Sequence, residues 1–165
     1  MTLRLSIKNM IKPLLRLFIV VTVIVTIGFL YAGGYDANLL PGFIIILCIP
    51  VLPTTYLFIE YYIATRNQVV EITNDSISVK KKNGSTVHYS FSELKILKLY
   101  KSAGMEKGSF PYQTAEMFYH AKIKTKDDRV LILTSFLGPK FDDALDLIKN
   151  VDKEITRTTY STIYI

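Results

Sequence analysis

Two long apolar segments fill the first third of this chain and limit what it can fold into. They cover residues 17–35 and 39–63, and Asp36 is the only charged residue between positions 17 and 59. A helix of about 20 residues crosses a hydrocarbon layer of about 30 Å. We therefore predict two transmembrane helices over these ranges, an external turn at residues 36–38, and the lipid bilayer as the first partner of the protein.

The second predicted span contains two prolines, Pro50 and Pro53. Each proline removes a backbone donor, so the pair predicts a kink or a local break in the helix. Broken helices line ion sites in some transporters. Two helices cannot enclose a pathway by themselves, and no charged residue lies at mid-membrane, so we interpret the kink as a packing feature.

Basic residues predict how this hairpin is oriented. The segment between the two spans has no basic residue, whereas Arg66 follows the second span. The basic residues that precede the first span are Arg4, Lys8, Lys12 and Arg16. By the positive-inside rule, both termini are predicted to lie in the cytoplasm, with Tyr61 and Tyr62 at the inner membrane interface.

The four N-terminal cations recur at every fourth position, which places them along one stripe of a helix. Apolar residues occupy much of the remaining surface. This pattern predicts that residues 1–16 form a basic amphipathic lead-in, with its cations on anionic lipid headgroups. An ordinary basic flank of a membrane helix explains the same charges, so both interpretations stay open.

From residue 67 onward the pattern changes to short alternating segments, over a length typical of one small domain. Asn83-Gly84 and Asp127-Asp128 are turn signals between such segments. The predicted strands cover residues 68–73, 76–82, 85–91, 94–101, 116–126 and 129–136. Apolar residues from Phe141 to Ile155 then follow the helical period, which predicts a C-terminal helix.

The predicted soluble domain therefore spans residues 67–157, and a tail of residues 158–165 follows it. This tail alternates Tyr160 and Tyr164 with Ile163 and Ile165. The alternation is typical of an added strand. A tail that stays disordered until it meets a partner is the alternative.

Two membrane helices, about six strands in hairpins and a final helix form an order that resembles a known family. The likeness is carried by residues 67–73, 76–79, 89–95 and 130–133, which read NQVVEIT, SISV, YSFSELK and VLIL. Over residues 10–155 the chain resembles the bacterial pleckstrin-homology-like (PH-like) membrane proteins, in particular the YcxB-like type with an N-terminal membrane hairpin.

This resemblance implies an α+β domain in which a curled antiparallel β-sandwich or barrel of six to seven strands is capped by the C-terminal helix. It also implies a bacterial inner membrane location. No enzyme activity and no catalytic residues follow from it.

The residues themselves carry no catalytic, cofactor or metal motif. His88 and His120 are the only histidines, and neither has a partner at metal-ligand spacing. We expect both on strands, at the surface or half-buried. Cys48 is the only cysteine, so no disulfide forms within the chain. Because arginines are scarce in the soluble part, a nucleic-acid partner is not expected.

Two features of the predicted domain are candidates for binding. Lysines gather on its strands at Lys80, Lys81, Lys82, Lys122, Lys124 and Lys126. They predict either contact with anionic lipid headgroups or a solvated sheet face. A glycine-flanked loop holds Met105, Phe110, Pro111 and Tyr112, which either bind a partner or cap the core.

The sequence thus favours a non-catalytic, membrane-anchored binding or scaffold protein. We expect it to act as an accessory subunit that binds another membrane protein or a peptide through its domain and hairpin. A sensor of anionic headgroups or leaflet charge is the first alternative, and an uncharacterised enzyme is the second.

Overall fold

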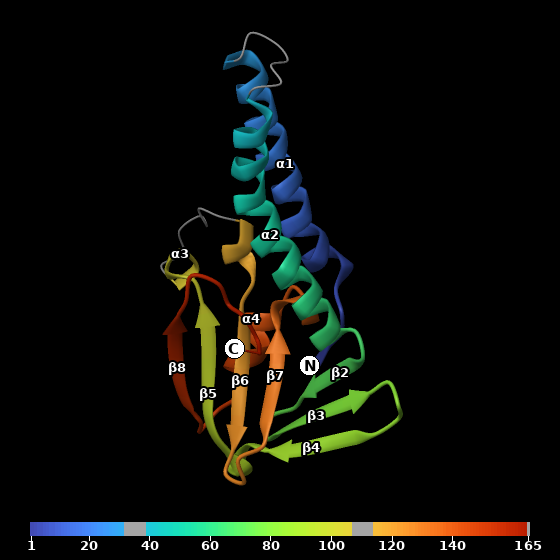
Figure 1. Cartoon of the computed structure of the whole chain (residues 1–165). Helices are drawn as coiled ribbons and strands as arrows, with labels where there is room; N and C mark the ends of the chain where they lie inside the picture. The colour runs from blue at the N-terminus through green and yellow to red at the C-terminus, as the bar shows by residue number, and fades with distance from the viewer. Residues whose placement is uncertain (32–38, 107–113, 165) are drawn as a thin grey trace.

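The computed structural model describes residues 1–31, 39–106 and 114–164. Figure 1 shows two long helices, α1 (Ile7–Tyr31) and α2 (Leu40–Thr65), side by side above a domain of two sheets. By length and composition, both helices are apolar enough to cross a membrane. The predicted turn at residues 36–38 lies outside the described residues.

Neither long helix is interrupted at its prolines. The first helix runs through Pro13, so most of the predicted lead-in and the first predicted span form one continuous helix. The second helix runs through Pro50 and Pro53, which therefore do not break it. A backbone surrounded by lipid has no water to bond to, which favours an uninterrupted helix. The kink itself stays a prediction.

The N-terminus belongs to the domain, which corrects the predicted helical lead-in over residues 1–16. Strand β1 (Thr2–Leu3) pairs antiparallel with β2 (Gln68–Ile72), and the amino group of Met1 donates to the Ile72 carbonyl. Leu3 is buried in the main core. The helix begins only at Ile7, because the residues before it are held by the sheet.

The domain consists of two four-stranded sheets. The first has the order β1-β2-β3-β4, with β3 at Ser76–Lys81 and β4 at Thr86–Ser90. The second has the order β7-β6-β5-β8, with β5 at Leu94–Lys101, β6 at His120–Thr125, β7 at Val130–Thr134 and β8 at Asp152–Arg157. The two sheets share no strand pairing among the described residues, so the predicted barrel is not closed.

The predicted hairpins are confirmed, and their turn residues explain them. The turn from β3 to β4 places Gly84 at φ 84°, a conformation that glycine adopts without strain. The turn from β6 to β7 places Asp128 at φ 63°, which aspartate tolerates better than most residues. Both of these residues belong to the dipeptides that the sequence marked as turn signals.

The predicted C-terminal helix is only partly correct. Helix α4 covers Phe141–Asp146, and residues 152–157 form strand β8, which pairs in parallel with β5. Asn150 takes a positive φ of 59° in the turn between them. The β-branched Ile155 and Thr156 then match the register of β5, so sheet pairing replaces further helix.

Short helical turns connect the strands. They are η1 (Phe91–Glu93), α3 (Ala103–Glu106), η2 (Thr114–Met117) and η3 (Ser135–Leu137). Ser90 and Glu93 form a capping box around η1. This box fixes the passage from the first sheet into the second.

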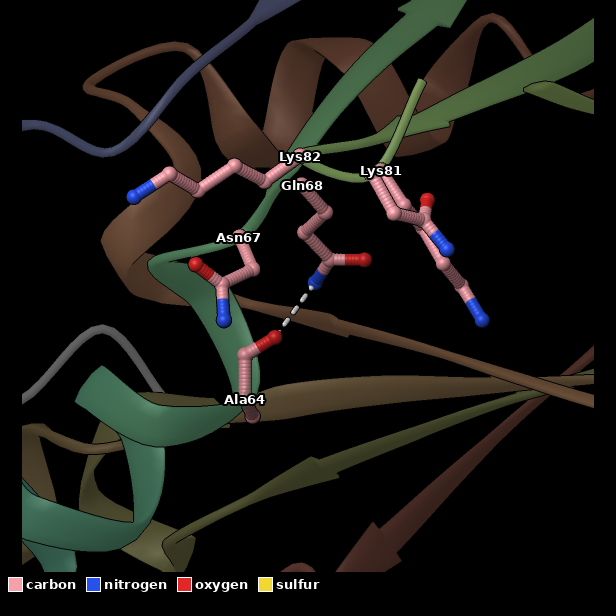
Figure 2. Close-up of a pocket in the computed structure, with 6 residues that line it drawn as sticks. Ala64, Asn67, Gln68, Lys81 and Lys82 are labelled. Atoms are coloured by element: carbon pink, nitrogen blue, oxygen red, sulfur yellow. Dashed lines mark hydrogen bonds between the residues drawn. The ribbon is translucent and has the colours of Figure 1, made fainter. Parts of the chain in front are cut away.

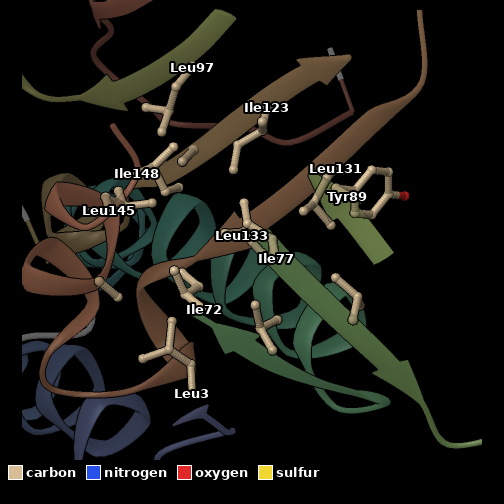
Figure 3. Close-up of a cluster of buried hydrophobic side chains, with 14 of the residues drawn as sticks. Leu3, Ile72, Ile77, Tyr89, Leu97, Ile123, Leu131, Leu133, Leu145 and Ile148 are labelled. Carbon is tan, nitrogen blue, oxygen red and sulfur yellow. The ribbon is translucent and has the colours of Figure 1, made fainter. Parts of the chain in front are cut away.

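The main core lies between the two sheets and α4. Figure 3 shows Ile72 and Ile77 of the first sheet facing Ile123 and Leu133 of the second, with Ile148 closing one side. All five side chains are buried. The alternation read from the sequence thus places the apolar face of each sheet inward.

A second apolar cluster joins the helix pair to the domain. Its buried members are Leu57, Tyr61, Ala115, Phe118, Phe136 and Ile163. Tyr61 makes edge contacts with the rings of Phe118 and Phe136, at centroid distances of 5.2 and 5.7 Å. The helices therefore pack directly on the domain, and α2 passes into β2 with almost no linker.

Replacing Leu3 with alanine tests the placement of the N-terminus. We expect the change to lower the free energy of unfolding by about 2–5 kcal/mol, because it removes a buried core side chain. Ile7→Ala is the matched control, since Ile7 is 71% exposed and its loss is expected to cost within about 0.5 kcal/mol. Urea titration of both variants in mild detergent measures the difference. Equal effects would contradict the core position of β1.

Candidate functional site

The predicted lysine set does not form one surface. Lys81 and Lys82 line a groove of about 540 Å³ between the end of α2 and the hairpin of β3 and β4. Lys124 and Lys126 lie toward the hairpin of β6 and β7, at the end of the domain farthest from the helices (Figure 1). Only part of the set therefore lies near the helix end of the molecule.

Several of the sheet lysines also have partners. Lys124 lies 2.8 Å from Asp128, and its hydrogen bond lowers the pKa of that carboxyl group. Lys122 lies over the ring of Tyr100, 5.2 Å from its centroid. These contacts favour the interpretation of this sheet face as a solvated surface of paired charges.

Figure 2 shows the groove at the end of α2. Gln68 Nε2 donates to the Ala64 carbonyl at 2.9 Å, which holds the last turn of α2 on β2. The amide of Lys82 donates to the Asn67 carbonyl at 2.8 Å. The side chains of Lys81, the last residue of β3, and Lys82, the first residue of the turn, point apart in the figure. The groove thus has charges at its rim and amides at its centre.

The N-terminal cations lie on two different surfaces. Arg4, Lys8 and Lys12 are exposed, and the exposed apolar residues Ile7 and Ile11 lie beside them. This combination of exposed cations and exposed apolar side chains is typical of a segment that lies at a membrane surface.

Arg16 is half-buried and is coupled electrostatically to Glu116 of η2. Glu60 instead accepts a hydrogen bond from the amide of Tyr164, at 3.2 Å. Arg16 thus adds an electrostatic contact between α1 and the domain, and Glu60 adds a contact between α2 and the tail.

The predicted binding loop is only partly described. Met105 lies in α3, where its side chain is half-buried and its amide donates to Ser102 Oγ at 3.2 Å. Phe110, Pro111 and Tyr112 lie outside the described residues. The role of this loop stays a prediction.

His120 is the centre of a buried polar cluster, which the sequence did not predict. Its ring is fully buried and stacks on Tyr100, with centroids 4.7 Å apart. Its Nδ1 lies 3.0 Å from Tyr61 Oη and 2.8 Å from Ser161 Oγ. The expectation of a surface or half-buried histidine is wrong for His120 and correct for His88, which is exposed.

The hydrogen bonds of this cluster assign its protons. Tyr61 Oη donates to the Ser161 carbonyl at 2.7 Å, and Ser161 Oγ donates to the Tyr100 carbonyl at 3.2 Å. Both hydroxyl oxygens are then left to accept, so His120 Nδ1 carries the proton and donates to them. Burial, and then the positive charge of Lys122, lower the pKa of His120 to about 4, so the ring is neutral at pH 7.

The tail over residues 158–164 is seated on this cluster. We call the surface on which it lies the tail groove. The groove is formed by Leu57, Glu60 and Tyr61 of α2, Tyr100 of β5, His120 of β6, Ala115 of η2, Phe118 and Phe136. Ile163 enters the apolar part and Ser161 the polar part. The tail is therefore ordered, and it is not the added strand that was one of its two predicted forms.

The signal for this groove was partly visible in the sequence. In the structure, Ser161 and Ile163 are buried, and Tyr160 and Tyr164 are exposed. This burial pattern agrees with the alternation that the sequence of the tail shows. Tyr61, assigned from sequence to the membrane interface, is fully buried against the domain. Which element the tail would pack against depends on contacts far apart in the chain, so no local pattern shows it.

Among the described residues, no group of three or more His, Cys, Asp or Glu side chains is arranged to hold a metal ion. His120 is the buried one of the two histidines, and its Nδ1 donates a hydrogen bond to Ser161 of the tail. The arrangement binds and orders a peptide segment by hydrogen bonds and apolar contact.

The architecture defines a class of protein: two sheets of four strands and a short C-terminal helix, joined to a pair of long apolar helices. A family model described as a PH domain matches residues 3–142, which include both helices. The chain belongs to the PH domain family. No curated protein matches it.

The burial of His120 predicts a loss of stability in acid. The native pKa of about 4 lies below the unfolded value of 6.5, so the unfolded state binds more protons between these values. Stability is full above pH 6.5 and falls as the pH drops toward 4, by about 3 kcal/mol at most. The measurement compares the free energy of unfolding at pH 7 and pH 4.5 in wild type and His120→Asn.

The asparagine variant is expected to show a smaller loss between these two pH values, because it has no imidazole to protonate. His88→Asn is the matched control and is expected to keep the wild-type loss, since His88 is exposed. An unchanged loss in His120→Asn would contradict a buried neutral imidazole.

Proposed function

We propose that this protein is a non-catalytic, membrane-anchored binding or scaffold protein. It acts as an accessory subunit that binds another membrane protein or a peptide. The observation that carries the proposal is the packing of α2. One side of this helix packs on the PH-like domain, and the rest of it is an apolar helix long enough to cross a membrane. A partner bound to either part thereby acts on the other.

Exposed surfaces support a binding role. Along α1 and α2, large apolar side chains are exposed over nearly the whole length, Ile19 and Ile45 among them. Lipid covers such side chains in a lone protein, and a neighbouring helix covers some of them in a complex. On the domain, β4 and β8 are outer strands of their sheets within the described part of the chain. Such edges accept a strand from a partner.

The location is part of the same proposal. We place the helices in the inner membrane of a bacterium, with both ends of the chain in the cytoplasm, as in the YcxB-like type. The basic flanks of the hairpin support this orientation. Both ends are also held by the domain, through β1 and through the tail.

The non-catalytic part of the proposal is supported by the site itself. Catalysis requires a reactive group within reach of a substrate. His120 is fully buried under the tail, and Nδ1 is engaged by Tyr61 and Ser161. This histidine therefore orders the chain's own segment.

Purification of the intact protein at native abundance in gentle detergent tests the scaffold role. We expect a second membrane protein in fixed ratio to it. A photo-crosslinking residue at Ile45, which is 66% exposed on α2, is expected to capture that partner. The same residue at Lys126, on the distant hairpin, is the matched control and is expected to capture less. A lone monomer in several detergents, with no crosslink from Ile45, would contradict the proposal.

Contact with an anionic leaflet is a second candidate function, favoured by the exposed residues at the start of α1. Arg4, Lys8 and Lys12 lie beside the exposed Ile7 and Ile11. Each cation near an anionic surface contributes about 1 kcal/mol. The N-terminal segment is better placed for this contact than the paired lysines of the second sheet.

Nanodiscs of different charge test this candidate with the whole chain. We expect a higher melting temperature in anionic than in zwitterionic discs, and a smaller difference at high salt. Replacing Arg4, Lys8 and Lys12 with glutamine is expected to remove the difference. Replacing Lys124 and Lys126 with glutamine is the control and is expected to keep it. The same difference in both variants would contradict the assignment to the N-terminal segment.

A further inference from the structure

We propose that the tail groove is a peptide-binding site whose present occupant is the chain's own tail, and that a segment of a partner protein displaces it. The inference rests on the proposed binding function, for which it names the site and the class of partner. The partner segment carries a small hydroxyl side chain and, two residues later, a β-branched apolar one, as Ser161 and Ile163 do.

The tail is held by hydrogen bonds and by apolar contact, in the manner of a ligand. Ser161 accepts from Tyr61 through its carbonyl, and its hydroxyl lies 2.8 Å from Nδ1 of His120. Ile163 is 2% exposed within the apolar part of the groove. Tyr160 and Tyr164, which alternate with them, are exposed. The groove therefore recognises two side chains at a spacing of two residues, Ser161 and Ile163, and leaves the flanking Tyr164 side chain exposed.

Release of the tail removes no strand and no buried member of the main core. Strand β8 ends at Arg157, so residues 158–164 belong to neither sheet. The buried members of the main core include no residue of the tail. The tail's backbone makes no ladder with β5 beyond the single bond from Thr158 to the Lys101 carbonyl, among the bonds of the described residues. Segments with few such bonds open at low free-energy cost.

The tail also leaves part of the groove unsatisfied. Glu60 Oε2 and His120 Nε2 are buried and have no hydrogen-bond partner among the described residues. His120 Nε2 is an acceptor, since Nδ1 of the same ring holds the proton, and a carboxylate oxygen such as Glu60 Oε2 is an acceptor as well. An unpaired buried polar group carries a free-energy cost, which a ligand with donors at these two points removes.

The position of the groove specifies where the partner segment lies. One wall is the last two turns of α2, at the domain end of the helix (Figure 1). A tethered tail has a high effective concentration, so a free peptide competes poorly with it. A segment next to a membrane helix of another protein is held beside the groove, so it competes with the tail at a comparable effective concentration. We therefore assign the partner segment to the juxtamembrane region of a membrane protein.

A cut chain tests whether the tail is an exchangeable ligand. A protease site is inserted between Thr158 and Thr159 of the full chain in detergent, and the folded protein is cleaved. A fluorescent peptide with the sequence TYSTIYI, residues 159–165, is then added. We expect saturable binding, read by anisotropy, to the cut chain and binding at least tenfold weaker to the uncut chain.

Peptide variants test the apolar anchor point at Ile163. Ile163→Asp in the peptide is expected to weaken binding at least tenfold, because it places a charge in the apolar part of the groove. Tyr164→Ala is the matched control and is expected to change binding less than threefold, since that side chain is 67% exposed. Equal binding of the aspartate variant would overturn the assignment of the groove.

Two other outcomes overturn the proposal. If the cut chain loses its near-ultraviolet circular dichroism, or retains its tail without exchange over a day, the tail is a fixed structural element. The full-length variant Ile163→Asp distinguishes a failure of the groove assignment from a failure of the scaffold role. If a partner co-purifies with this variant at the wild-type ratio, the groove assignment is contradicted and the scaffold role is not. If the variant recovers more partner than the wild type does, displacement of the tail is supported.

Discussion

The packing of α2 against the domain is the interaction on which the rest of the structure depends. Leu57 and Tyr61 are fully buried by the domain, although the helix that carries them continues as an apolar span. Burying a side chain of this kind contributes about 1.5–3 kcal/mol. Phe118 and Phe136 supply the opposing rings from two different connections, so the helix pair contacts the sheet at both. Because Arg66 leads at once into β2, no flexible linker separates the two parts.

Most of the sheet structure is predictable from local sequence, because its signals are local. Strand alternation and two turn dipeptides locate β2 to β7, and the same alternation places Ile123 in the core. Strand β1 has two residues, too few to show a period, and it forms only because β2 is available. In β8, Ile155 continues a helical apolar pattern by coincidence, and the parallel pairing with β5 decides the outcome. Such pairings between distant segments leave no mark in a local pattern.

The candidate site shows the same division. Alternation on β6 correctly separates the buried Ala121, Ile123 and Thr125 from the lysines on the opposite face. His120 is in phase with those lysines, so the pattern predicts exposure for it. It is buried because the tail and α2 cover that end of the sheet face. The contacting residues are far away in the chain: Ser161 lies 41 residues after His120, and Tyr61 lies 59 residues before it. Lys124, farther along β6, lies beyond this cover and pairs with Asp128 at the surface.

This partial cover explains why one face of a sheet has two different chemistries. At the end near the helices, a neutral imidazole and a tyrosine hydroxyl bind backbone and side-chain groups of a peptide segment. At the other end, charged pairs keep the surface hydrated. Glu60 and Tyr61 form part of the groove, whereas neighbouring residues of α2 such as Ile59 and Ile63 are exposed, so one helix contacts the groove's occupant and also presents an exposed apolar surface. A change in how this segment is seated therefore acts first on the contacts of α2, because Tyr61 and Glu60 bond to the tail directly.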